Sequence, residues 1–297
     1  MTWNLFLQHL ANGISLGGLY ALIAIGYTIV YGVLRLINFA HGDIFMMGAY
    51  IAFYGVALFL LPWYVSFPLA IVVAAILGMI IERAAYRPLR DAPRVSVLMS
   101  AIAVSILLQN IGFVLFGGVP KAFPRPSLFA QVWNLGGVAV LSLTFYTVLI
   151  SAALLVAMAY LVYRTKVGRA MRAVSWDFEI AKLMGININH VISLTFAIGS
   201  VLAVAGSIMW SMKFPQLLPL MGVTPGLKCF IAAVVGGIGS VPGAVLGGFI
   251  LGLGEVMIVA FLPGLSGFKY AFAYSALILV LLLKPRGLLG KMAEEKA

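Results

Sequence analysis

Only a few ionisable side chains fall inside the long apolar stretches of this sequence, and they are the first candidates for chemistry. His41 and Asp43 belong to LINFAHGD at residues 36–43, and Glu255 lies within GGFILGLGEVMIVAF. Ionisable residues at membrane depth are costly and usually mark a substrate or ion pathway. Two plainer interpretations stay open: Asp43 as the N-cap of a helix over 44–61, and Glu255 as a contact at a subunit interface.

The residue patterns of the common enzyme classes are missing. The three histidines (His9, His41 and His190) are far apart, Cys229 is the single cysteine, and no H-E-x-x-H or C-x-x-C motif occurs, so we predict no metal site. No G-x-S-x-G elbow and no G-x-x-x-x-G-K-[ST] phosphate loop is found. We therefore predict a chain without catalytic residues or cofactors. Active transport would draw on an ion gradient or on an ATPase subunit.

A charged segment, GRAMRAVSWDFEIAKLMGI at 168–186, interrupts the apolar sequence. It has no proline or glycine between Gly168 and Gly185, which predicts one uninterrupted helix of about four turns ending at Gly185. Met171, Val174, Phe178 and Ala181 recur at the spacing of one helical face. Two interpretations compete: a helix lying on anionic lipid, or one docking on a cytoplasmic partner. The acidic Asp177 and Glu179 favour the protein partner.

The elements that position these residues are predicted to be membrane helices. The 297 residues are 63% hydrophobic and 9% charged, which is typical of a polytopic membrane protein. The net charge of +11 then reflects basic cytoplasmic loops and not nucleic-acid binding. We predict one all-α domain over residues 1–297 with eight to ten membrane segments. Apolar windows lie at roughly 8–33, 43–61, 67–82, 95–116, 139–163, 188–212, 228–240, 243–262 and 269–284.

The basic clusters predict the orientation of the chain. Lys and Arg gather at 83–94, 164–182 and 284–296, and an even number of apolar windows separates each neighbouring pair of clusters. All three clusters therefore fit the cytoplasmic side, with the C-terminus inside and the polar segment 117–138 outside. Counting back places the N-terminus outside, but a re-entrant segment would change the count, so its side stays open.

Two interruptions of the apolar sequence resemble each other. Residues 36–43 and the glycine-rich residues 236–243 each lie between apolar helices, one in each half of the chain. Such pairs predict two related halves with the pathway at their interface, although glycines also serve close helix packing. The candidate pathway residues are Asn38, His41, Gly42, Asp43, Gly236, Gly237, Gly239 and Glu255.

The sequence also resembles a known family, the LivH-type permease subunits of high-affinity branched-chain amino acid ABC importers. The resemblance covers nearly the whole chain. Its motifs are GLYALIAIGYTIVYGVLRLINFAHGDIFMMGAY at 18–50, IERAAYRPLR at 81–90, LMSAIAVSILLQN at 98–110, RAVSWDFEIAKLMGI in the charged segment, and AAVVGGIGSVPGAVLGGFILGLGE at 232–255.

The resemblance implies a function and a set of partners. The chain would be half of a permease that imports leucine, isoleucine or valine across the bacterial inner membrane. Its partners would be a second, related permease, two cytoplasmic ATPases that use ATP, a solute-binding protein and membrane lipid. The coupling residues would be Arg169, Ala173, Asp177, Ala181 and Gly185. Urea, short amides or other amino acids stay open as substrates, and a stand-alone carrier or channel is the remaining alternative.

Overall fold

The computed structural model describes residues 3–90 and 92–290, which form a bundle of long helices with four short strands. The long apolar helices are α1 (Trp3–Leu34), α3 (Trp63–Ile81), α4 (Arg94–Phe116), α6 (Ser142–Arg164), α9 (Ile188–Lys213), α11 (Val241–Phe261) and α12 (Lys269–Leu283). The shorter helices are α2 (His41–Ala57), α5 (Ser127–Ala130), α7 (Lys166–Trp176), α8 (Phe178–Leu183) and α10 (Val223–Gly236).

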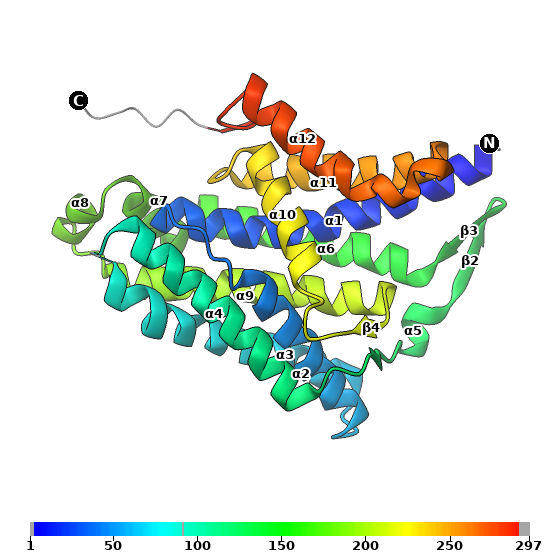
Figure 1. Ribbon diagram of the computed structural model, residues 1–297, viewed down its shortest axis with the longest axis horizontal. Helices are drawn as coiled ribbons and strands as arrows, with labels where there is room; N and C mark the ends of the chain where they lie inside the picture. The colour runs from blue at the N-terminus through cyan, green and yellow to red at the C-terminus, as the bar shows by residue number, and fades with distance from the viewer. Residues whose placement is uncertain (1–2, 91, 291–297) are drawn as a thin grey trace.

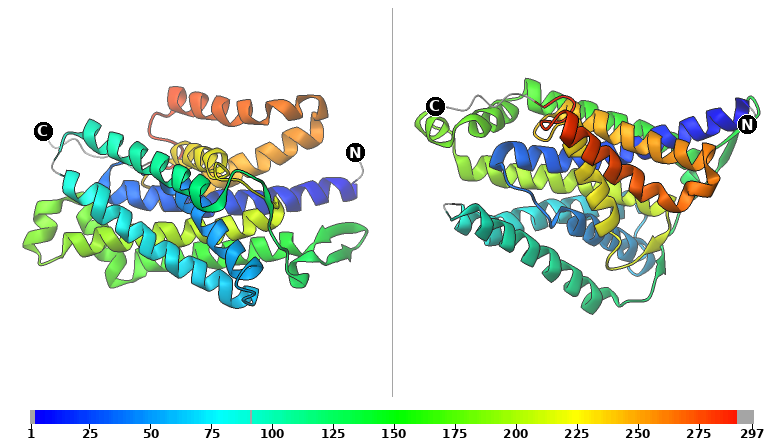
Figure 2. Two further views of the ribbon diagram at one scale, coloured as in Figure 1. Left: turned by 60° about the horizontal axis from the view of Figure 1, so that its bottom comes forward. Right: turned by 45° about the horizontal axis from the view of Figure 1, so that its top comes forward.

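The bundle has two distinct ends, and most of its long helices run between them (Figure 1). The helices α7 and α8 lie at one end, and the opposite end carries the start of α1 and a hairpin formed by β2 (Val132–Leu135) and β3 (Val138–Leu141). The two turned views in Figure 2 keep the same separation. The helices α7 and α8 and the β2–β3 hairpin therefore mark opposite ends of the bundle.

Among the described residues, seven helical stretches are long and apolar enough to cross a membrane, which confirms a mainly helical multi-pass membrane protein. The total number of membrane segments remains a prediction, because α2 has 17 residues and α10 only 14. Both are shorter than the roughly 20 residues that span a ~30 Å hydrocarbon layer. The basic cluster at 284–296, from which the orientation is predicted, is described only in part, because Lys291 and Lys296 lie outside the described residues.

The core of the bundle is built around α1 and α9. In α1 the most apolar window is 94% buried, whereas in α12 it is 6% buried, so α12 lies on the surface. Helices α1 and α11 pack against each other through small residues. A Cβ atom on Gly252 would collide with the backbone of Gly17, which explains the glycines of α11 as packing residues.

The polar segment 117–138 contains structure that the apolar pattern does not reveal. It begins with β1 (Lys121–Ala122), which pairs with β4 (Gln216–Leu217), and ends in the β2–β3 hairpin. The β1–β4 pairing ties this segment to the end of α9. The arginine of the segment, Arg125, donates to the carbonyl of Met212 from Nε at 3.0 Å, which strengthens the same connection.

The two predicted interruptions are present as breaks between helices. The first separates α1 from α2 at residues 35–40, and the second separates α10 from α11 at residues 237–240. A third irregular segment, residues 214–222, precedes α10 and contains β4. The start of α2, directly after the first break, meets this third segment. Gly42 packs so closely on Gly222 that a Cβ at Gly42 would lie 2.7 Å from the Gly222 carbonyl oxygen.

The segment 168–186 differs from the single helix that its sequence predicts. Helix α7 ends at Trp176, Asp177 is extended with φ −158° and ψ 122°, and α8 starts at Phe178. The cause is a cap: the Asp177 side chain accepts hydrogen bonds from the backbone N–H groups of Glu179 and Ile180, at 2.9 and 3.0 Å. Gly185 ends α8 with φ +78°, as predicted.

Candidate functional site

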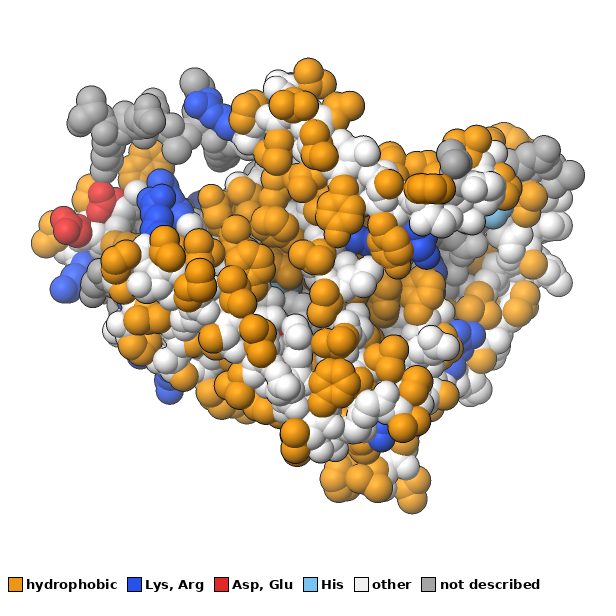
Figure 3. Space-filling model, viewed as in Figure 1, with side chains coloured by type: hydrophobic (Ala, Val, Ile, Leu, Met, Phe, Trp, Pro, Cys, Tyr) orange, Lys and Arg blue, Asp and Glu red, His pale blue; other side chains and the backbone are white. Residues whose placement is uncertain are grey.

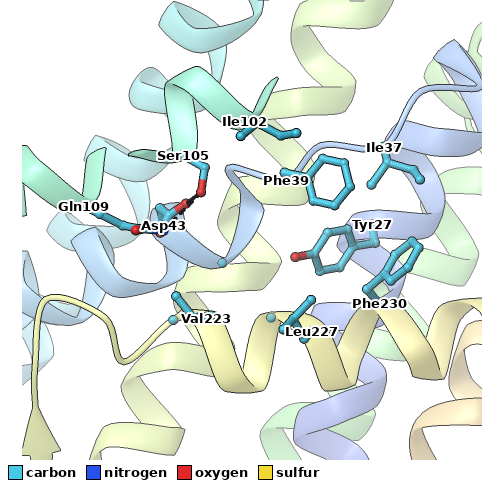
Figure 4. A pocket seen from close by; sticks show the side chains of 13 residues that line it. Tyr27, Ile37, Phe39, Asp43, Ile102, Ser105, Gln109, Val223, Leu227 and Phe230 are labelled. Atoms are coloured by element: carbon cyan, nitrogen blue, oxygen red, sulfur yellow. Dashed lines mark hydrogen bonds between the residues drawn. The ribbon is translucent and has the colours of Figure 1, made fainter. Parts of the chain in front are cut away.

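A cavity of about 180 Å³ lies where the first break meets α4 and the start of α10 (Figure 4). Its walls come from four parts of the chain that are distant in sequence. They are the end of α1 with residues 35–40, the first turn of α2, the middle of α4, and the first two turns of α10. The two short helices therefore both begin at this cavity. Short, interrupted helices that begin inside a membrane domain are the usual place for a transported solute.

One side of the cavity is polar. Asp43, in the first turn of α2, accepts a hydrogen bond from Ser105 Oγ at 2.5 Å and from Gln109 Nε2 at 3.1 Å. Ser105 and Gln109 are one turn apart on α4, so both face the carboxylate, as Figure 4 shows. Asp43 is not the N-cap of α2, because that position is held by Ala40. The capping interpretation of Asp43 is therefore wrong, and the side chain instead lines the cavity.

The carboxylate of Asp43 has only neutral hydrogen-bond partners. Asp43 is 2% exposed, yet the three ion pairs within residues 3–90 and 92–290 join other side chains. None of the residues that line the cavity is basic. A buried carboxylate without a cation is costly, which makes this position a candidate for receiving a positively charged group.

The other side of the cavity is aromatic and aliphatic. Ile37 and Phe39 come from the first break, Tyr27 from α1, and Leu227 and Phe230 from α10. Figure 4 shows the rings of Phe39, Tyr27 and Phe230 gathered opposite the Asp43 carboxylate. The cavity thus presents a carboxylate on one side and an apolar surface on the other. Such an arrangement suits a small molecule with a cationic group and an apolar group.

The first break holds its other polar residues away from this cavity. Asn38 is 3% exposed and accepts a hydrogen bond from Tyr86 Oη at 3.0 Å. His41 is 1% exposed and packs on the ring of Tyr27, with the ring centroids 4.3 Å apart. Neither side chain lines the cavity. Of the four candidates within residues 36–43, Gly42 and Asp43 line the cavity, whereas Asn38 and His41 pack against Tyr86 and Tyr27 outside it.

The candidates of the second half lie elsewhere. Gly236, Gly237 and Gly239 form the turn between α10 and α11, which packs on the backbone around Gly287 and Gly290. This turn is also fixed by the N–H of Leu289, which donates to the Gly236 carbonyl at 2.8 Å. The structure therefore does not bring these glycines to the cavity. The segment that meets the start of α2, residues 214–222, does not resemble the first interruption in sequence. A role of the three glycines in the pathway stays a prediction.

Glu255 forms a buried ion pair instead of lining the cavity. Both of its carboxylate oxygens lie 2.7 Å from Lys228 Nζ, and Tyr20 Oη donates to Oε2 at 2.7 Å. The ring of Tyr270 covers the ammonium group, with Nζ 4.4 Å from the ring centroid. The ion pair joins α10 to α11, and the two tyrosines add α1 and α12. Its role in this arrangement is to hold four helices together.

Another buried carboxylate, Glu82, was not among the sequence candidates. Glu82 is fully buried and accepts hydrogen bonds from Arg87 at 2.9 Å, Arg90 at 3.2 Å and Ser193 at 2.6 Å. It starts a π-helical turn, Glu82–Tyr86, and the same turn carries Tyr86, the donor to Asn38. The signal in the sequence was a glutamate in IERAAYRPLR with arginines one, five and eight residues later.

The end formed by α7 and α8 exposes apolar side chains together with charged ones. Trp176, Leu183 and Met184 are 72%, 86% and 77% exposed. They lie beside the exposed Arg169 and Glu179. Figure 3 shows acidic and basic side chains gathered at this end of a face that is otherwise mainly apolar. Exposed aromatic and aliphatic residues within a charged surface are typical of a protein interface.

The five candidate coupling residues have different environments. Arg169 is exposed, Ala173 is partly buried, and Ala181 is 2% exposed beneath α8. Asp177 and Gly185 shape the backbone at the two ends of α8. The structure brings them into one cap, but the outward-facing surface belongs mainly to Trp176, Ile180 and Leu183. The sequence signal for this exposed face was the spacing of these three residues, first four and then three positions apart.

Comparison with known proteins agrees over almost the whole chain. Residues 9–283 match the family described as "Branched-chain amino acid transport system / permease component". The permease protein LivH of the high-affinity branched-chain amino acid transport system of Escherichia coli (strain K12) is 40% identical, with 98% of this chain and 97% of LivH aligned. BraD of Pseudomonas aeruginosa, a permease protein with the same system description, is also 40% identical, with 98% of each chain aligned.

A more distant relative and a solved structure agree on the architecture. The xylose transport system permease protein XylH of Haemophilus influenzae is 29% identical over 52% of this chain and 46% of XylH. A chain of PsaBC from Streptococcus pneumoniae in complex with Fab has a TM-score of 0.52, with 12% identity over 94% of this chain and 92% of that chain. This last likeness concerns the fold alone. From its matched residues and its LivH and BraD relatives, the chain belongs to the permease component family of branched-chain amino acid transport systems.

Proposed function

We propose that this chain is a permease subunit of an ATP-driven importer of leucine, isoleucine and valine in the bacterial inner membrane. The observation that supports it most is the 40% identity to LivH over 98% of the chain. The chain would supply half of the translocation pathway and a second, related permease the other half. Two cytoplasmic ATPases would hydrolyse ATP, so that this chain needs neither a catalytic site nor a cofactor, and a solute-binding protein would deliver the amino acid.

The test of this function is uptake by the reconstituted importer. The permease pair, its ATPases and its binding protein are placed in liposomes, and uptake of labelled leucine, isoleucine and valine is measured with ATP on the ATPase side. We expect ATP-dependent uptake of all three. Urea, acetamide and a cationic amino acid serve as comparison solutes. Uptake of urea or acetamide without uptake of leucine would refute the substrate assignment, and gradient-driven uptake without the ATPases would refute the importer class.

Within the proposed pathway, the cavity at Asp43 is the place where this subunit contacts the solute. The Asp43 carboxylate would receive the α-ammonium group, and the apolar side formed by Ile37, Phe39 and Phe230 would receive the branched side chain. A hydrogen bond to a charged group contributes about 1.5–3 kcal/mol. What supports this role is that no ion pair among the described residues includes Asp43, although the side chain is buried.

We expect Asp43→Asn to lower leucine uptake by about tenfold or more, since 1.4 kcal/mol corresponds to a factor of ten. The substitution keeps the shape of the side chain and removes its charge. Stimulation of ATP hydrolysis by the loaded binding protein is measured in the same liposomes and should remain. Ser105→Ala is the matched control, because it removes one hydrogen bond and keeps the carboxylate. Full uptake by Asp43→Asn would show that the carboxylate does not meet the solute.

The α7–α8 cap would dock into an ATPase subunit. Exposed Trp176 and Leu183 are the anchors that this role needs, because a few large apolar side chains carry most of the free energy of an interface. We expect Trp176→Ala with Leu183→Ala to reduce co-purification of the ATPases and to abolish uptake. Val156→Ala, an equally exposed apolar position on α6, should leave both unchanged. Normal ATPase recovery with the double variant would refute the docking surface.

A further inference from the structure

A second cavity, of about 420 Å³, lies at the α7–α8 end of the molecule between α3 and α9. Basic and polar groups line one side of it: Arg83 and Arg87 after α3, and Asn187, Asn189 and His190 at the start of α9. Met79 and Leu194 line the side that faces the middle of the bundle. The cavity therefore changes from basic to apolar along the direction of the helices.

The basic side of this cavity carries an excess of positive charge. None of the described residues that line the cavity is acidic, and the neighbouring buried Glu82 is shared by Arg87 and Arg90. Arg87 keeps a third of its side chain exposed despite this pairing, and Arg83 is exposed. The cavity also meets the first turn of α9, a helix of 26 residues whose positive end adds to the field. These groups together suit a phosphate-bearing anion.

The apolar side of the cavity continues along the seam between α3 and α9. On α3 the partly buried positions Met79, Ala75 and Ile71 follow one another at intervals of four residues. On α9 the positions His190, Leu194 and Val201 lie on one face at helical spacing. The seam leads to a third cavity, of about 330 Å³, lined by apolar residues that include Ile71, Leu154 and Val201.

The length of the seam fits one acyl chain. Arg83 and Ile71 are twelve residues apart, which corresponds to about 18 Å at 1.5 Å per residue. Half of the hydrocarbon thickness is about 15 Å. The outward face of α3 beside the seam exposes Val72, Ile76 and Ile80, an apolar surface that contacts lipid when the chain is in the membrane. A headgroup at Arg83 thus places its acyl chain against the apolar part of the seam.

We propose that the α3–α9 seam binds an anionic phospholipid of the cytoplasmic leaflet, with its phosphate at Arg83, Arg87 and His190 and an acyl chain along Met79, Ala75 and Leu194. The proposal rests on the orientation proposed above, in which the α7–α8 end is cytoplasmic. It concerns a lipid and not the transported solute, so its failure would leave the transport function untouched. A bound lipid would fasten the ends of α3 and α9 beside the docking cap.

The experiment measures lipid binding to the full-length permease in its complex. The complex is stripped of lipid in neutral detergent, and binding of phosphatidylglycerol and of phosphatidylcholine with the same acyl chains is followed by native mass spectrometry. We expect tighter binding of phosphatidylglycerol. Glycerol 3-phosphate at the same concentration tests the headgroup alone, and it should not compete if the acyl chain contributes.

The variants locate the site. Because one basic residue near the membrane surface contributes about 1 kcal/mol, Arg83→Gln and His190→Gln are each expected to weaken phosphatidylglycerol binding, Arg83→Gln by about fivefold. Lys284→Gln is the matched control, an exposed basic residue after α12 and outside the seam. Ala75→Leu narrows the seam and should weaken binding of both lipids, with uptake and thermal stability showing that the variant folds.

Three results would overturn the proposal. They are equal affinity for the two lipids, equal affinity of Arg83→Gln and Lys284→Gln for phosphatidylglycerol, and full competition by glycerol 3-phosphate. The first two would mean that the basic groups select no headgroup. The third would mean that the cavity binds a soluble phosphate and that the seam does not hold an acyl chain.

Discussion

At the scale of residues, two acidic side chains with little exposure differ in their partners and therefore in their roles. Asp43 and Glu255 are both carboxylates within apolar sequence, but Glu255 is neutralised by Lys228 at 2.7 Å and Asp43 is held only by Ser105 and Gln109. The first is an ion pair between two helices, and the second is a carboxylate that lines a cavity and that we propose as a binding site. The partner, and not the residue type, decides between these roles.

The ion pair yields a prediction about stability. Glu255→Gln leaves the ammonium group of Lys228, with a side chain only 7% exposed, without its counter-charge, so we expect a loss of roughly 3 kcal/mol in the free energy of unfolding. Thermal unfolding in detergent measures it. The double variant Lys228→Met with Glu255→Leu removes both charges and should recover most of the loss. A single variant as stable as the wild type would contradict a structural role for the pair.

Two glycines act at the same scale by allowing backbones to meet. Gly42 lies in the first turn of α2 and Gly222 ends the segment before α10, and a Cβ on either would collide with the carbonyl group of the other. Their contact brings the starts of two short helices to one cavity. A side chain at either position would separate the polar wall of the cavity from the α10 wall.

At the scale of elements, the cap formed by α7 and α8 depends on one side chain. Asp177 divides the segment because its carboxylate binds two N–H groups at the start of α8. Arg172 of α7 also donates a hydrogen bond to the Val162 carbonyl, which ties α7 to the end of α6. The direction of α8 relative to α7 is therefore set by the cap at Asp177 and not by helix propensity.

This cap predicts a graded effect of substitution. We expect Asp177→Ala to destabilise α8 by about 1 kcal/mol and to reduce the efficiency of coupling, because N-cap loss typically costs that much. Asp177→Asn retains a capping oxygen and serves as the control. The measurement is leucine uptake per ATP hydrolysed by the reconstituted complex. If Asp177→Ala and Asp177→Asn behave alike and both fail, the negative charge and not the cap is what matters.

At the scale of the whole molecule, the two ends of the bundle differ in chemistry. One end carries α7, α8, the arginines of 83–90 and the turn after α12, and the other carries the β2–β3 hairpin. The basic loops gather at the first end, and the positive-inside rule is the reason why we propose that this end is cytoplasmic. The segments with broken helices lie between these ends, and the cavity at Asp43 opens to the surface of the bundle beside the exposed Ile102 and Leu227.

Labelling in vesicles tests this orientation. Cysteines are introduced at exposed Gln131 before β2 and at exposed Met184 after α8, since the native Cys229 is buried. An impermeant maleimide should label Gln131→Cys in right-side-out vesicles and Met184→Cys in inverted vesicles. The reverse pattern would mean that the chain is inserted with the α7–α8 end outside. Labelling of the wild type reports any reaction at Cys229.

The sequence by itself determined the class of molecule and the parts that depend on local chemistry. Long apolar windows predicted the membrane helices because a hydrocarbon layer demands that length. Gly185 and the apolar face of Met171, Val174 and Ala181 were predictable because caps and helix faces involve neighbours along the chain. The breaks around 36–43 and 236–243 were visible for the same reason.

The tertiary structure decided which of these parts meet. The partner of the first break is the segment 214–222, and the carboxylate of Asp43 finds Ser105 and Gln109 more than sixty residues away. The pairing of Glu255 with Lys228 and the burial of Glu82 under two arginines likewise depend on helix packing. A single sequence does not show which distant segments come into contact. Those contacts decide whether a buried charge finds a partner, and therefore how much its burial costs.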